Sequence, residues 1–336
     1  MTTQQITESD PTSSTRRRRR RQDAVRGTEF TLVVLAVAGY VVLAVTTHGS
    51  VVSGDTLTAI FQFLAVPMVI GLSQMAVLSV GQMNLSVGVL TGFCAVVCAW
   101  LMVTAGLPAW LAVTGAILTG AAIGLVNGLL VVVTRINGFI VTLATMTIID
   151  GLRYGVHGTA TYQGYSHGLV SLGQGSLLGV PIVFLVAVAV AVAVAWFFRN
   201  VTVGRQLLAS GGNPLAARLS GISNDRSLVV AHLMSGLLAG VAGVIVVALS
   251  GSVNATVGDD LLLPSFAAPI IGGVALAGGV VSVLGTCLAA LIIRLVDVAQ
   301  AQYSINPDWV DLIVGAVVLG AVLLTQLRHA KPGGTT

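Results

Sequence analysis

Residues 183–198 read VFLVAVAVAVAVAWFF, and this stretch decides the class of fold. Its side chains are apolar in every direction, whereas the strands of a membrane β-barrel alternate apolar and polar residues. A helix of about 20 such residues crosses a lipid bilayer. Of the 336 residues in the chain, 55% are hydrophobic and only 8% are charged. Water-soluble domains carry about 25% charged residues, so the sequence predicts an all-α, polytopic membrane protein.

Apolar runs separated by glycine, proline and charged residues predict about ten transmembrane helices. We place them at residues 30–47, 57–80, 85–104, 109–133, 138–156, 180–198, 227–250, 262–280, 281–301 and 309–327. With both termini in the cytoplasm, the inner connections and tail hold Arg135, Arg199, Arg205, Arg218, Arg226, Arg328 and Lys331, and the outer loops hold Asp55, Asp259, Asp260 and Asp308. This distribution follows the positive-inside rule. It predicts a multi-pass protein of the cytoplasmic (plasma) membrane, surrounded by lipid.

The two ends of the chain are polar. Residues 1–29 include six consecutive arginines at 16–21 and bury too little apolar surface to fold, so a disordered basic cytoplasmic tail is predicted. Arginines directly before an apolar helix orient it and contact anionic head groups, so no nucleic-acid partner is expected. Residues 30–328 then form the transmembrane domain, and residues 329–336 form a second cytoplasmic tail.

The connection at residues 199–226 is longer than two packed helices require. Asn213 is a good N-cap, Pro214 suits the first helical position, and Gly221 can end the helix in the left-handed conformation. A two-turn helix outside the membrane is therefore predicted, with Asn213, Pro214, Leu215, Ala216, Ala217, Arg218, Leu219 and Gly221 as its residues. Leu215 and Leu219 share one face. This face is suited to binding by another protein, and the alternative is a helix that lies on the membrane surface.

Proline and glycine interrupt the predicted second and eighth helices. The interruptions are Pro67, Pro264, Pro269 and the glycine pairs at 272–273 and 278–279. Non-helical backbone persists at membrane depth only where protein or a water-filled cavity satisfies its polar groups. Discontinuous helices are therefore predicted, and such helices recur at the substrate sites of transporters. Glycines spaced four residues apart, at 120–128 and at 236–240, predict close packing between helices.

Two pairs of charged residues lie well inside apolar runs, Asp150 with Arg153 and Arg294 with Asp297. Charges within a bilayer are unfavourable and often functional. Each pair is spaced i, i+3, however, so its members can neutralise each other on one helical face. Structural pairing and the lining of a pathway both stay open as interpretations.

No enzymatic site is predicted. The chain holds one lysine, Lys331, so it contains no phosphate-binding loop of the G-x-x-x-x-G-K-[ST] type. The five histidines lack the spacing of metal ligands, and although Cys94 and Cys98 share a helical face, no histidine or carboxylate accompanies them. We therefore expect no catalytic residue, no metal and no cofactor in this chain.

Several motifs resemble those of one family of membrane proteins. They are GQMNLSVG at residues 81–88, GLVNGLL at 124–130, FIVTLATM at 139–146 and GGNPLAARLSGI at 211–222, followed by SGLLAG at 235–240, IGG at 271–273 and LAGG at 276–279. Together they resemble the membrane permease subunits of bacterial ATP-binding-cassette (ABC) importers for ribose, xylose and related simple sugars. The resemblance covers roughly residues 60–325. It implies a fold like that of type II ABC importers.

The resemblance also implies partners. In similar permeases the loop helix is a coupling helix that binds a separate ATPase subunit, where ATP is used. A second permease subunit, identical or different, and an extracellular solute-binding protein complete the importer. The residues placed at the pathway are Gln82, Asn84, Ser86, Asn127, Thr142 and Pro269. One departure is that Gln82 and Asn84 stand where the family pattern G-G-x-D-L-S-V-G has glycine and aspartate.

Two other functions are compatible with the residues. A self-sufficient, proton-coupled carrier could use Asp150 or Asp297 as its titrating group. A structural or channel-forming scaffold is the third possibility, although the sequence lacks a ring of like charges or a filter-like loop.

Overall fold

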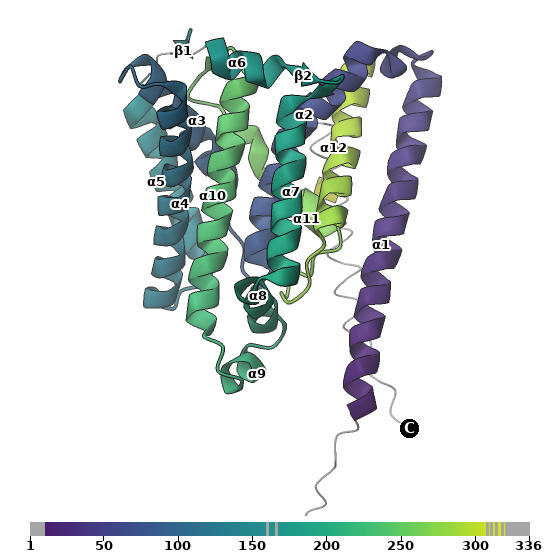
Figure 1. Ribbon diagram of the computed structural model, residues 1–336, viewed down its shortest axis with the longest axis vertical. Helices are drawn as coiled ribbons and strands as arrows, with labels where there is room; N and C mark the ends of the chain where they lie inside the picture. Colours follow the sequence, from purple (N-terminus) through teal and green to yellow (C-terminus); the bar gives the residue numbers. More distant parts are fainter. Residues whose placement is uncertain are drawn as a thin grey trace, which may run out of the picture.

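The computed structural model describes residues 11–158, 161–164 and 167–306, and beyond them residues 309, 312, 315, 316 and 319. Within these ranges, side chains are described from Gly27 onward, except those of residues 156, 157 and 167. The elements, in chain order, are α1 (Pro11–Thr46), η1 (Ser50–Val52), α2 (Gly54–Leu78), α3 (Val87–Val103), α4 (Ala109–Thr134), α5 (Gly138–His157), β1 (Tyr162–Gln163), α6 (His167–Gln174), β2 (Ser176–Leu177), β3 (Val180–Pro181), α7 (Ile182–Asn200), α8 (Thr202–Gly212), α9 (Pro214–Leu219), α10 (Asn224–Leu249), β4 (Ser252–Val253), η2 (Asp259–Leu261), α11 (Leu262–Ile271) and α12 (Val283–Tyr303). The long helices run side by side (Figure 1).

Six helices in the described part of the chain are long and apolar enough to cross a membrane: α1, α2, α4, α7, α10 and α12. α3 is also apolar but has 17 residues, and α11 has 10. α5 has 20 residues and contains the charged pair Asp150 and Arg153. The prediction of an all-α membrane protein is confirmed. The count of ten stays a prediction, because most of the tenth expected helix, 309–327, lies outside the described residues.

α1 begins earlier than the sequence indicated. Its helix starts at Pro11, inside the segment 1–29 for which a disordered tail was predicted. Arginine is a good helix former, and residues 12–26 contain neither glycine nor proline, so the apolar helix can continue toward the N-terminus. From Gly27 onward α1 packs mainly on α12, and Leu43 of α1 and Leu295 of α12 belong to one buried hydrophobic cluster.

α10 is the centre of the bundle and packs against α4, α2 and α3. The glycines predicted to form packing stripes are at the α4–α10 contact. A Cβ atom added at Gly120 would lie 2.4 Å from the carbonyl oxygen of Gly236, and one added at Gly124 would lie 2.4 Å from that of His232. The two backbones are therefore in direct contact, as small residues allow between membrane helices. The prediction of close packing is confirmed.

The interruptions occur at glycines and not at prolines. α2 runs through Pro67, and α11 runs through Pro264 and Pro269, so the predicted break at Pro67 is wrong. Neighbouring helices enclose α2, and such packing tolerates the one hydrogen bond that proline removes. The predicted eighth helix, 262–280, does stop at Ile271. Non-helical segments then join α11 to α12 and α2 to α3, at residues 272–282 and 79–86.

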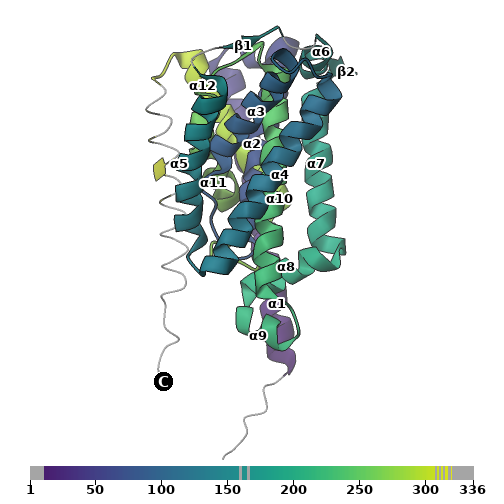
Figure 2. The same cartoon turned by 90° about the vertical axis from the view of Figure 1, so that its left-hand side faces the viewer.

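The two ends of the bundle differ. α8, α9 and the start of α10 lie at the end where α1 begins (Figures 1 and 2). This end carries Arg199 and Arg205. The opposite end carries α6 and two short antiparallel strand pairs, β1 with β4 and β2 with β3. Asp55 lies in the first turn of α2, and Asp259 begins η2, where it contacts the buried Arg153.

Candidate functional site

The predicted helix outside the bundle is α9, Pro214–Leu219, and its caps form as the sequence indicated. The side-chain oxygen of Asn213 accepts a hydrogen bond from a backbone N–H of the first turn, at 3.0 Å. Gly221 follows in the left-handed conformation with φ 79°. Leu215 and Leu219 are 70% and 82% exposed. These two leucines form an exposed apolar face on α9, beyond the end of the bundle. The caps at both ends of α9 fix the helix that carries this face.

α9 is fixed to its neighbours by its opposite face. Ala217 is buried, and the side chain of Asn224 at the start of α10 donates a hydrogen bond to the carbonyl of Pro214 at 2.9 Å. The hydroxyl of Ser210 in α8 lies 2.7 Å from the side-chain oxygen of Asn224 and donates to it. Of the residues predicted for this helix, the exposed ones are Asn213, Pro214, Leu215, Ala216, Arg218, Leu219 and Gly221. α8, α9 and the start of α10 are therefore tied into one unit.

A second contact ties this end of the bundle together. Arg135, directly after α4, forms a bidentate ion pair with Asp225 of α10, with nitrogen to oxygen distances of 2.6 and 2.9 Å. The hydrogen bonds that Arg135 donates to the Asp225 carboxylate raise the pKa of the Arg135 guanidinium. Both side chains are exposed, so the pair contributes little to stability.

α8 meets both non-helical segments through glycine backbone. A Cβ atom at Gly211 would lie 2.0 Å from the carbonyl oxygen of Ser79, and the N–H of Gly279 donates to the same oxygen at 2.9 Å. A Cβ atom at Gly278 would lie 2.6 Å from the nitrogen of Gly81. We call these five residues the glycine junction. Because no side chain separates the backbones, a displacement of α8 would be transmitted directly to the segments 79–86 and 272–282.

Four of the predicted pathway residues, Asn84, Ser86, Asn127 and Thr142, converge on segment 79–86. The Asn84 side chain donates to Ser235 at 3.1 Å and accepts from the Ser86 hydroxyl at 2.6 Å, and Asn127 donates to Ser86 at 3.2 Å. Thr142 accepts from the backbone N–H of residue 85 at 3.1 Å. All of these side chains are fully buried. Thr142 and Asn84 thereby accept from backbone N–H groups of residues 85 and 86, which satisfies non-helical backbone within the bundle.

The remaining two pathway candidates lie apart from this network. Gln82 accepts from the backbone N–H of Gly138 at 2.9 Å, at the start of α5. Pro269 is buried in α11, against the position of Gly71 in α2. Asn84 uses both its donor and its acceptor, which explains how an amide fits at this motif position. A pathway role for these six residues stays a prediction.

Sequence reasoning missed a buried histidine beside this network. His232 of α10 is fully buried, and neither ring nitrogen has a hydrogen-bond partner among the described residues. Its Nε2 atom lies 3.6 Å from the Cβ position of Gly138. The spacing of the sequence gave no signal for it, because its neighbours come from other helices.

In the first intramembrane charge pair, Asp150 with Arg153, the arginine has two further partners. The guanidinium of Arg153 binds Asp150 at 2.5 Å, Asp259 at 2.7 Å and the carbonyl oxygen of Val257 at 2.8 Å. The Arg153 side chain is 1% exposed, while the two carboxylates are about half exposed. Arg153 therefore fastens the segment before α11 to α5, in addition to the i, i+3 pairing that the sequence indicated.

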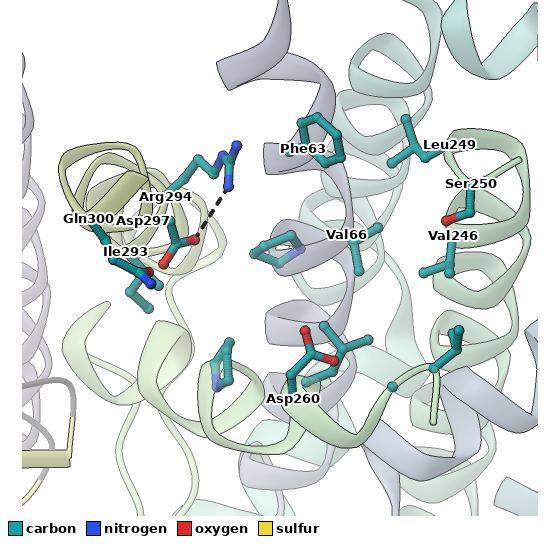
Figure 3. Close-up of a pocket in the computed structure, with 15 residues that line it drawn as sticks. Phe63, Val66, Val246, Leu249, Ser250, Asp260, Ile293, Arg294, Asp297 and Gln300 are labelled. Carbon is teal, nitrogen blue, oxygen red and sulfur yellow. Dashed lines mark ion pairs between the residues drawn. The ribbon is translucent and has the colours of Figure 1, made fainter. Parts of the chain in front are cut away.

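The second pair lines a cavity of about 540 Å³ between α2, α10, α11 and α12 (Figure 3). We call it the polar cavity, and its side chains with aromatic or polar character are Phe63, Ser250, Asp260, Arg294, Asp297 and Gln300. Arg294 Nη1 lies 3.6 Å from Asp297 Oδ2, and the guanidinium carbon lies 5.1 Å from the centre of the Phe63 ring. Sequence spacing identified the charged pair, but not the other four residues, which come from separate elements.

The chain matches known proteins over most of its length. Residues 54–322 match the family described as branched-chain amino acid transport system / permease component. This chain belongs to that permease family. The permease is 33% identical to the L-arabinose ABC transporter permease protein of Azospirillum brasilense over 260 residues, which cover 77% of this chain and 76% of the relative.

Two further relatives are import permeases. The galactose/methyl galactoside import permease protein of Escherichia coli (strain K12) is 32% identical over 219 residues, 63% of this chain and 65% of the relative. The ribose import permease protein of Haemophilus influenzae is 31% identical over 284 residues, 83% of this chain and 87% of the relative. No solved structure shows a significant match.

These matches confirm the resemblance to the permeases of ABC importers. Together with the six long apolar helices, they identify an integral protein of the inner membrane. The three relatives are transport permeases rather than enzymes.

Proposed function

We propose that this permease is the membrane-spanning subunit of an ABC importer and forms the pathway for a simple sugar of the ribose or xylose type. An extracellular binding protein delivers the sugar, and a second permease subunit completes the pathway. A separate ATPase subunit binds and hydrolyses ATP and drives transport through α9. The sugar assignment is supported by the names of the relatives, which specify L-arabinose, galactose and ribose.

The observation that carries the proposal is the exposed face of α9. Leu215 and Leu219 project from a capped helix that lies beyond the end of the bundle, and Arg218 lies beside them. An exposed apolar anchor next to an arginine is typical of a protein interface. The glycine junction links α8 to the non-helical segments within the bundle, so it supports a role for α9 in moving them.

The decisive experiment changes the face of α9 without touching its caps. Arg218→Glu combined with Leu219→Asp should abolish co-purification of the ATPase and reduce sugar uptake by cells to background. Arg205→Glu is the matched control, because it reverses an exposed charge on the neighbouring α8. If the double variant kept both ATPase association and uptake, the coupling role of α9 would be refuted.

The proton-coupled alternative is tested in the same cells. Asp150 and Asp297 each face an arginine on their own helix, at 2.5 and 3.6 Å, so each already has a structural partner. We expect Asp150→Asn and Asp297→Asn to leave uptake dependent on ATP and resistant to a protonophore. Uptake that a protonophore abolishes while ATP is maintained would instead support the carrier.

A further inference from the structure

We propose that the polar cavity is a binding site for a neutral polyol, into which the transported sugar enters at the end of the bundle opposite α9. This inference rests on the proposed function and adds to it a site and the residues that hold the ligand. The cavity of about 540 Å³ lies within the range of about 300–1,000 Å³ that ligand pockets occupy. It accommodates a single monosaccharide together with several water molecules, each of which takes about 30 Å³.

One wall of the cavity is suited to the apolar face of a sugar ring. Phe63 of α2 lines the cavity, is 48% exposed and lies beside the guanidinium of Arg294. Aromatic rings contribute large contact area at binding sites. Pro67, one turn later in α2, also lines the cavity. Because proline has no N–H, the carbonyl of Phe63 lacks its usual helical partner from residue 67 and can accept a hydrogen bond from a ligand.

The facing wall supplies both hydrogen-bond donors and acceptors. Arg294 and Gln300 offer N–H groups, and Asp297 and Gln300 offer oxygen atoms, all from one face of α12 (Figure 3). The Nε atom of Arg294 is buried without a hydrogen-bond partner among the described residues. The Arg294–Asp297 distance of 3.6 Å exceeds that of a hydrogen-bonded ion pair, about 2.7–2.9 Å. A hydroxyl group both donates and accepts, so it can bridge these two side chains.

The charges of the cavity select against anionic ligands. Asp260 and Asp297 carry two negative charges and Arg294 carries one positive charge. A sugar phosphate would meet an excess of negative charge at short range. An amino-acid zwitterion would have to place its carboxylate against Arg294 and therefore beside Asp297, and the two like charges would repel each other. A neutral ligand rich in hydroxyl groups meets neither obstacle.

Arg153 positions another part of the wall. Val257, Gly258 and Leu261 line the cavity, and Arg153 holds this segment through the carbonyl of Val257 and the carboxylate of Asp259. Arg153 itself is buried on the other side of the segment and does not line the cavity. Arg153 is therefore a positioning residue. One intramembrane charge pair, Arg294 with Asp297, lines the cavity directly, and Arg153 of the other pair holds a segment of its wall.

The test measures binding by the full-length chain in lipid nanodiscs, by saturation-transfer difference NMR. The probes are D-ribose, D-xylose, L-arabinose and D-galactose, with ribose 5-phosphate and L-leucine for comparison. Phe63→Ala should weaken the binding of the preferred sugar about fivefold, through lost stacking contact. Gln300→Leu should weaken it about tenfold, because sugar hydroxyls lose their partner.

The controls match these variants closely. Phe139→Ala removes a ring of similar exposure, 44%, from α5 outside the cavity. Gln302→Leu makes the same change two residues further along α12, where Gln302 faces Ser50 instead. Saturable sugar binding that is weakened in both cavity variants and retained in both controls supports the site.

Three outcomes overturn the site: no saturable signal from any sugar, equal affinity in cavity and control variants, or preferential binding of leucine or ribose 5-phosphate. The α9 experiment is independent of these measurements. If sugar binding fails while the α9 double variant still loses the ATPase, the site is refuted and the coupling function stands. If sugar binding fails and the α9 double variant also keeps the ATPase, both the site and the proposed function are refuted.

Discussion

Two adjacent glycines at the end of α8 provide a controlled test of the glycine junction. Gly211 and Gly212 are both in the last turn of the helix, but a Cβ atom at Gly211 would lie 2.0 Å from the Ser79 carbonyl oxygen, whereas one at Gly212 would have its nearest neighbour at 3.6 Å. Replacing either by alanine brings the same gain in helix propensity, about 1 kcal/mol. A difference between the two variants therefore reports the contact alone.

The magnitude follows from the geometry. Ordinary contacts of a Cβ atom begin at 3.4 Å, so Gly211→Ala must move Ser79 and α8 apart by more than 1 Å. Overpacking of this kind costs about 1–3 kcal/mol, and the hydrogen bond from Gly279 to Ser79 contributes about 1 kcal/mol more. We expect Gly211→Ala to be about 2–4 kcal/mol less stable than Gly212→Ala.

Thermal unfolding of the purified protein in detergent measures this difference. Gly211→Ala should lower the Tm relative to Gly212→Ala by an amount on the order of 10 °C. Sugar uptake should fall in the Gly211→Ala variant alone, because displacement of α8 disturbs segments 79–86 and 272–282. Equal Tm values and equal uptake in the two variants would refute the direct backbone contact.

Two further substitutions test the contacts inside the bundle. Arg153→Met should make the amide protons of residues 254–261 exchange faster in hydrogen–deuterium exchange mass spectrometry, because Val257 and Asp259 lose the guanidinium that holds them; unchanged exchange would show that other contacts hold the segment. Asn84→Ala should lower the free energy of unfolding by about 2–4 kcal/mol, because Ser86 and Ser235 lose their buried partner. Ser53→Ala, at an exposed N-cap, should cost only about 1 kcal/mol and serves as its control in the same denaturation series.

Several features could be read from local sequence because local physics produces them. The apolar runs predict helices wherever about 20 residues lack charge, and α4, α7 and α10 occur within a few residues of the expected bounds. The caps of α9 depend on Asn213, Pro214 and Gly221, which all lie within one short segment. The close packing of α4 on α10 could also be predicted, because the four-residue spacing of their glycines is visible in the sequence.

Other features depended on partners that are distant in the sequence. Pro67 gives a strong signal for a break, yet surrounding helices keep α2 continuous. The spacing of Asp150 and Arg153 indicates a pair, but Asp259 joins them from more than 100 residues away. His232 lies alone in an apolar run, so its position beside the buried network could not be foreseen.

Composition and short-range periodicity by themselves determined that this permease is a bundle of membrane helices with a capped helix outside it. In a membrane, apolar side chains face lipid, and the backbone groups of each helix must form hydrogen bonds within that helix. Both requirements concern one continuous stretch of sequence. Only the tertiary structure decided which polar residues share a cavity. Phe63, Asp260 and Gln300 reach the polar cavity from three separate elements. These three residues come together only because the helices pack against one another. That packing depends on contacts between helix surfaces that are far apart in the sequence.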